Sequence, residues 1–115
     1  MARGLLITGA ILLAATALFH MTGLSSVSGW LEGGRGTIVA LLWSTAAASW
    51  VIVALIWICA ALRPSPALKM PVWISALIPI SVGIPLLAMV DAGHPGGYLL
   101  LLSAVLAAIG AGRQR

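Results

Sequence analysis

The charged residues of the chain stand in small groups that separate four long apolar segments. The segments without a formal charge contain 28, 27, 21 and 21 residues, in the intervals Arg3–Glu32, Arg35–Arg63, Lys69–Asp91 and Asp91–Arg113. A helix of about 20 apolar residues spans the hydrocarbon core of a bilayer, which is about 30 Å thick. The pattern therefore predicts an all-α integral membrane protein, with four transmembrane helices in an up-down bundle.

Glycine and proline positions predict where these helices begin and end. We expect one domain, 1–115, with helices at about 4–22, 37–62, 72–90 and 97–112, an outer loop 23–36, a cytoplasmic loop 63–71 and an outer turn 91–96. Pro79 and Pro85 lie inside the third helix. Each proline removes a backbone donor and crowds the carbonyl four residues earlier. We therefore expect the third helix to be kinked or partly unwound near residues 80–85.

The outer loop carries its own helical pattern. Val27, Trp30 and Leu31 recur at helical spacing among serines and glycines, which predicts a short segment along the outer membrane surface. Glu32 and Arg35 can pair there, but an exposed pair of this kind contributes little stability.

Composition supports the membrane interpretation and excludes several classes of protein. Hydrophobic residues make up 62% of the chain and charged residues 7%, whereas about a quarter of the residues in soluble domains are charged. The net charge of +4 does not predict nucleic-acid binding, because the basic residues stand singly or in pairs at segment ends. The single cysteine, Cys59, excludes an intramolecular disulfide.

The basic residues also predict an orientation. With four helices, only Arg35 falls on one side of the membrane, and five basic residues fall on the other: Arg3, Arg63, Lys69, Arg113 and Arg115. Cytoplasmic loops carry the excess of lysine and arginine. We therefore expect a multi-pass protein of the plasma membrane (the bacterial inner membrane) with both termini in the cytoplasm.

Three tryptophans repeat every seven residues along the second predicted helix. Trp43, Trp50 and Trp57 form a nearly straight row on one helix face, called here the tryptophan row. Trp50 falls near mid-membrane, where its indole N–H needs a hydrogen-bond partner. The row is either the wall of a site for an apolar ligand, such as a quinone, a pigment or a lipid, or a packing ridge against another helix or lipid.

Small residues mark helix-packing faces on the second and fourth helices. The candidate packing residues are Thr45 and Ser49 on the second helix, and Ala104, Ala108 and Gly112 on the fourth. Small side chains let membrane helices approach closely. The two faces either contact one another within one chain, or serve a homo-oligomer or a larger membrane complex.

Polar side chains that can carry chemistry gather at the predicted outer side. The candidate metal ligands are His20, Asp91 and His94, with Met21 and Met89 beside them. Histidine with carboxylate suits zinc or ferrous iron, histidine with methionine suits copper, and two histidines can ligate a haem. The alternative is ordinary turn chemistry, in which Asp91 accepts from backbone N–H groups, His94 is solvated and His20 reaches the interface.

These patterns favour a protein without catalytic activity. The serines have no activating base except the two outer histidines, and no carboxylate lies deep in the membrane as a proton-coupled exporter requires. We expect an accessory or structural membrane subunit that packs against a partner or binds an apolar, lipid-like ligand. The alternative is a metal- or haem-binding protein, or a small transporter, that uses the outer histidine, aspartate and methionine cluster.

Overall fold

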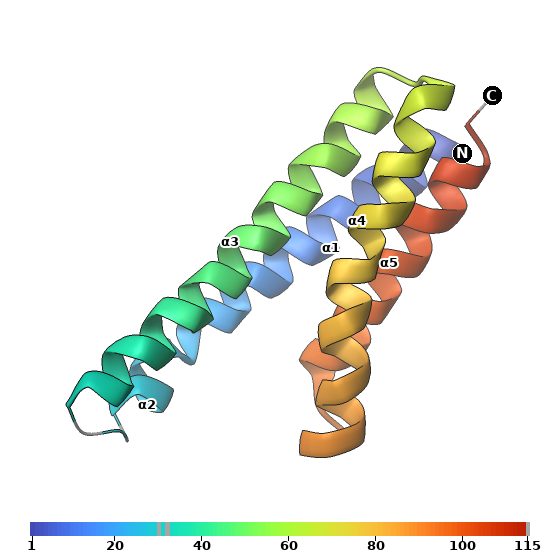
Figure 1. Cartoon of the computed structure of the whole chain (residues 1–115). Helices are drawn as coiled ribbons and strands as arrows, with labels where there is room; N and C mark the ends of the chain where they lie inside the picture. Colours follow the sequence, from blue (N-terminus) through green and yellow to red (C-terminus); the bar gives the residue numbers. More distant parts are fainter. Residues whose placement is uncertain (30, 32, 115) are drawn as a thin grey trace.

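The chain forms helices joined by short connections. The computed structural model describes residues 1–29, 31 and 33–114, and the predictions for Trp30, Glu32 and Arg115 lie outside this range. The elements are α1 (Ala2–Thr22), α2 (Leu24–Gly29), α3 (Gly34–Leu62), α4 (Pro66–Pro85), the π-helix η1 (Leu86–Val90) and α5 (Pro95–Gly112) (Figure 1). No strand occurs among the described residues, so the predicted all-α class is confirmed.

Four helical segments are long and apolar enough to cross a membrane. They are Ala2–Gly29, Gly34–Leu62, Pro66–Val90 and Pro95–Gly112. Many large aliphatic side chains on these segments point outward, and most of the buried apolar residues are alanines. Small residues inside and large apolar residues outside are typical of helices that pack within lipid. These features indicate a multi-pass membrane protein.

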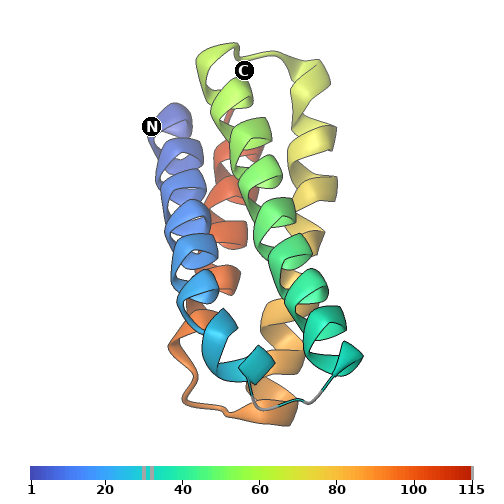
Figure 2. The ribbon, with the colours of Figure 1, turned by 90° about the vertical axis from the view of Figure 1, so that its left-hand side faces the viewer.

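The long helices form two pairs that diverge toward one end of the molecule. Both termini and the α3–α4 connection lie at one end, called here the terminal end; α2 and the turn before α5 lie at the other (Figures 1 and 2). Helix α1 packs extensively against α3 and α5, and α4 packs against α5, whereas α3 and α4 share a much smaller contact. The pair α1–α3 and the pair α4–α5 separate away from the terminal end (Figure 1).

The small face of α5 packs against α1 and not against α3. A Cβ at Gly9 of α1 would lie 2.8 Å from the carbonyl oxygen of Ser103, and one at Gly110 would lie 2.9 Å from Leu6 Cγ. Ala104 is fully buried in this region. Among the described residues α3 and α5 share no substantial contact, so the two predicted packing faces do not meet within the chain.

The other predicted packing residues lie at the margins of the bundle. Gly112 is exposed, and the carbonyl of Ala108 accepts a hydrogen bond from Trp73 Nε1 at 3.1 Å. Thr45 is exposed and Ser49 is half-buried. Their hydroxyls donate to carbonyls of their own helix, at 2.8 and 2.7 Å respectively, so neither hydroxyl joins two helices.

Helix α4 begins earlier than predicted and its irregular turn comes later. The Ser65 hydroxyl accepts from the backbone N–H of Ala67, and Pro66 occupies the first turn, where a missing N–H does no harm. The helix therefore starts at Pro66 and not near residue 72, and it continues to Pro85. The π-helix follows at Leu86–Val90, beyond the predicted 80–85. This short π-helical segment leads the chain into the turn before α5.

Candidate functional site

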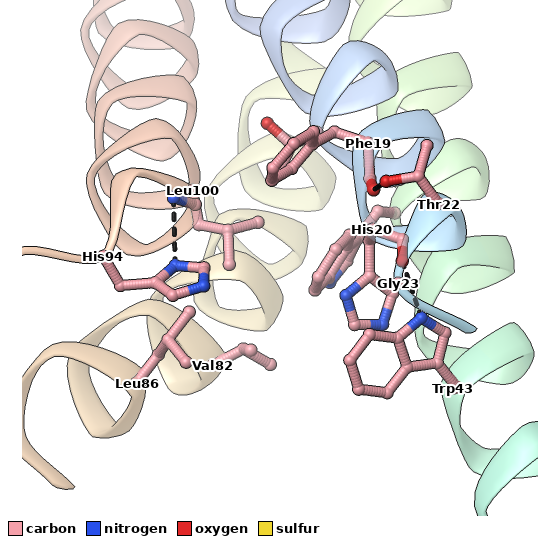
Figure 3. Close-up of a pocket in the computed structure, with 12 residues that line it drawn as sticks. Phe19, His20, Thr22, Gly23, Trp43, Val82, Leu86, His94 and Leu100 are labelled. Atoms are coloured by element: carbon pink, nitrogen blue, oxygen red, sulfur yellow. Dashed lines mark hydrogen bonds between the residues drawn. The ribbon is translucent and has the colours of Figure 1, made fainter. Parts of the chain in front are cut away.

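A cavity of about 330 Å³ lies between the two helix pairs, away from the terminal end (Figure 3). Its walls are mainly apolar. The lining residues come from α1 and its cap (Thr16, Phe19, His20, Thr22, Gly23), from α3 (Trp43, Trp50), from α4 and η1 (Val82, Leu86) and from α5 and its cap (His94, Gly96, Leu100). All four long helices thus contribute to one site of the size that small-molecule ligands occupy.

One wall of the cavity is an aromatic cluster of His20, Trp43 and Trp50. The imidazole of His20 stacks on the indole of Trp43, with ring centroids 4.0 Å apart and an interplanar angle of 7°. Trp50 lies against the same imidazole at 4.9 Å, tilted by 57°. Trp43 Nε1 also donates to the His20 carbonyl at 2.7 Å. This bond joins α3 to the end of α1 and holds the stacked rings in place.

The opposite wall is held by His94, which caps the N-terminus of α5. Its Nδ1 accepts from the backbone N–H of Gly96 at 3.1 Å. A nitrogen that accepts a hydrogen bond carries no proton, so the neutral ring must carry its proton on Nε2. The rings of His94 and His20 face each other across the cavity (Figure 3). The helix cap thus fixes both the orientation and the tautomer of His94.

Two nitrogens in the aromatic cluster lack hydrogen-bond partners. Trp50 Nε1 and His20 Nε2 are buried without a partner among the described residues, and Trp50 is only 3% exposed. A buried polar group without a partner destabilises a fold by about 1–3 kcal/mol. Such groups beside a cavity indicate that their hydrogen-bond partners are supplied by a bound molecule and not by the chain itself.

The tryptophan row divides between this site and the packed core. Trp43 and Trp50 line the cavity, whereas Trp57 does not. Trp57 is fully buried, and its Nε1 donates to Ser75 Oγ of α4 at 2.9 Å. Trp57 thus joins α3 to α4. Trp43 and Trp50 come earlier in α3, toward the end where the two helix pairs separate (Figure 1).

The polar residues predicted to lie at the outer side are only partly brought together. His20 and His94 share the cavity, but Asp91, Met21 and Met89 are exposed and do not line it. Asp91 Oδ1 accepts from the Gly93 N–H at 2.8 Å, which is the turn chemistry weighed as an alternative. Within the described part of the chain, no group of three or more histidine, cysteine or acidic side chains is placed to hold a metal ion.

Several cavity residues carried no signal in the sequence. Phe19, Val82, Leu86 and Leu100 belong to the apolar runs of their helices, and the side chains of lipid-facing residues are of the same types. Gly96 follows a proline in a helix-start pattern, which predicts a capped helix but not that the cap faces a cavity.

Fold and cavity together define the class: a small, multi-pass helical membrane protein with a ligand-sized site between its helix pairs. No protein-family model, curated protein or solved structure matches the chain.

Proposed function

We propose that this is a non-enzymatic membrane protein that binds an apolar, lipid-like molecule, such as a quinone, a pigment or a lipid, in the cavity between its helix pairs. The observation that carries the proposal is the mainly apolar cavity of about 330 Å³ with an aromatic cluster as one wall. Sites for small molecules combine apolar and aromatic walls with a few fixed polar groups. Here His20 and His94 supply those groups.

The surrounding hydroxyls support a binding role over a catalytic one. Thr16 Oγ1 donates to the Leu12 carbonyl at 2.7 Å, and Thr22 Oγ1 donates to the Phe19 carbonyl at 2.7 Å. Both hydroxyls in the cavity wall are therefore engaged with their own helix and not with a histidine that would activate them as nucleophiles.

The weak contact between α3 and α4 supports entry from the bilayer. These two helices share far less contact than α1 shares with α3 or α5. Trp43 and Trp50 stand on one side of this seam, and Val82 and Leu86 stand on the other. A lipid-like molecule partitions into the membrane first, so a seam that opens toward lipid is a suitable path to the cavity.

An accessory role in a larger complex or a homo-oligomer completes the proposal. The small face of α3 around Thr45 and Ala48 is exposed, and small residues are the usual contact surface between membrane helices. We place the contact with a partner helix on this face.

We further propose that the four helices form an up-down bundle in the bacterial inner membrane, with both termini in the cytoplasm. The terminal end carries Arg3, Arg63 and Arg113, as cytoplasmic ends do. A fluorescent protein fused after residue 115 is expected to fluoresce in the cytoplasm, and an alkaline phosphatase fused there is expected to be inactive. The reverse pattern would contradict this orientation and would place the cavity in the inner half of the membrane.

The binding proposal is tested by purification in mild detergent, followed by native mass spectrometry and lipid extraction. We expect a lipid-like molecule to remain bound at one copy per chain, or the empty protein to bind a short-tailed quinone in calorimetry. A protein that neither retains nor binds any such molecule would contradict the proposal. Stoichiometric transition metal or a haem absorption band that disappears in His20→Ala would instead favour metal or haem binding between the two histidines.

A further inference from the structure

We infer that the ligand of the cavity carries a flat ring with neutral hydrogen-bond-accepting oxygens on two edges, the chemistry of a quinone head group, held between His94 and the aromatic cluster. This inference rests on the proposed function, since it specifies the head group of the lipid-like ligand proposed there. It follows from the two N–H groups of the cavity walls, on His94 and Trp50, that have no hydrogen-bond acceptor among the described residues.

The first donor is His94. Its Nδ1 is occupied by the N–H of Gly96, so the neutral ring donates from Nε2. The cap holds the ring in place, and Figure 3 shows that ring facing the cavity. A ligand in the cavity therefore meets a fixed donor on the α5 side, and that donor requires an acceptor.

The second donor is Trp50 on the opposite wall. An indole N–H can only donate. The other two indoles of the tryptophan row already donate, Trp43 to the His20 carbonyl and Trp57 to Ser75. Trp50 Nε1 is buried without a partner among the described residues. This N–H has almost no accessible surface, so the Trp50 side chain must turn for a ligand to reach it. A single ligand that then satisfies both walls presents acceptors on two separate edges.

The charge and shape of the cavity walls further restrict which head groups can bind. Among the described residues, the cavity lining contains no lysine, arginine, aspartate or glutamate. A carboxylate or phosphate head group would therefore be desolvated without a counter-ion from these residues. Neutral carbonyl oxygens avoid this penalty. The stacked rings of His20 and Trp43 present aromatic faces, which pack well against another flat ring. A saturated chain or a plain carotenoid has no acceptor for the two N–H donors and no flat ring to pack against the stacked rings.

The test compares two ligands with one tail. A 1,4-benzoquinone with a decyl chain and decylbenzene each have a flat six-membered ring and the same tail, and only the quinone has the two carbonyl oxygens. Binding of each to the full-length protein in detergent is measured by calorimetry. We expect the quinone to bind at least tenfold more tightly than decylbenzene, because it forms two hydrogen bonds that the hydrocarbon lacks.

Two variants each remove one donor and keep the fold. Trp50→Phe keeps an aromatic ring without the N–H, and His94→Gly removes the imidazole donor at an N-cap position where glycine is well tolerated. Each is expected to weaken quinone binding about three- to tenfold more than decylbenzene binding, because only the quinone accepts a hydrogen bond. Trp57→Phe is the matched control, because Trp57 lies on the same helix outside the cavity; it is expected to leave both affinities unchanged.

The outcomes separate this inference from the proposed function. Equal affinities of the wild type for the two ligands would overturn the head-group inference and leave the apolar binding site intact. Equal weakening of both ligands by Trp50→Phe would also overturn it, since the ring would then act through packing alone. Binding of neither ligand would count against the proposed function itself.

Discussion

Gly9→Val is expected to destabilise the bundle by about 3 kcal/mol. A Cβ at this position would lie 2.8 Å from the carbonyl oxygen of Ser103 and 3.3 Å from the backbone nitrogen of Ala107. Both are backbone atoms of α5 and cannot rotate away. The larger side chain must therefore push α1 and α5 apart along their extensive contact. Thermal unfolding in detergent, followed by circular dichroism, measures the effect.

Gly4→Val is the matched control for this prediction. The two glycines lie on the same helix, but a Cβ at Gly4 meets nothing within 4 Å and the residue is exposed. We expect its unfolding free energy to change by no more than about 0.5 kcal/mol. Similar melting temperatures for Gly9→Val and the wild type would show that α1 and α5 do not pack as closely as described.

The largest expected effect on binding comes from Val82→Trp, which introduces an indole at the cavity wall. Val82 lines the cavity from α4 and is partly exposed, so the new ring has room to turn inward over the aromatic cluster. It would occupy the space that the ligand needs. We expect the affinity for the decyl benzoquinone to fall at least tenfold, the equivalent of about 1.4 kcal/mol, with little change in the melting temperature.

Ile84→Trp adds the same side chain to the same helix at an exposed position that does not line the cavity. It is expected to retain wild-type binding in the same calorimetric titration. Full binding by Val82→Trp would show that the ligand occupies another part of the molecule. An equal loss of quinone affinity in both variants would indicate a general effect of an added tryptophan on α4.

The four long helices were predictable because their signal is carried by charge spacing, and the bilayer sets the required length. Their packing partners were not. Small residues on α5 indicated a close contact, yet composition does not tell which helix supplies the other surface. In the structure it is α1, through Gly9 and Gly110. The start of α4 was misplaced because Pro71 resembles a first-turn proline as closely as Pro66, and the Ser65 cap decides between them.

The candidate site, like the fold, could be predicted from the sequence only in part. The sequence placed Trp43, Trp50 and Trp57 on one face, and that face does contact both the cavity and the core. The periodicity could not predict where α3 leaves α4, and this separation determines which indole lines the site. The predicted topology placed His20 and His94 at the same end of the bundle, but it could not show that they line one cavity, because that depends on how two distant helix ends are brought together. Among the described residues, the Asp91 side chain bonds only within its own turn.

The two ends of the molecule differ in the hydrogen bonds that join their helices, and each end has a buried polar atom without a partner among the described residues, Gln114 Oε1 at the terminal end and Trp50 Nε1 at the cavity end. At the terminal end, Gln114 Nε2 of the C-terminal segment reaches across to the Ala60 carbonyl of α3 at 2.7 Å, and Trp73 Nε1 joins α4 to the Ala108 carbonyl of α5. At the cavity end, the Trp50 N–H remains unused. A ligand that accepts a hydrogen bond from it would link the two helix pairs and would therefore stabilise the fold as well as occupy the cavity.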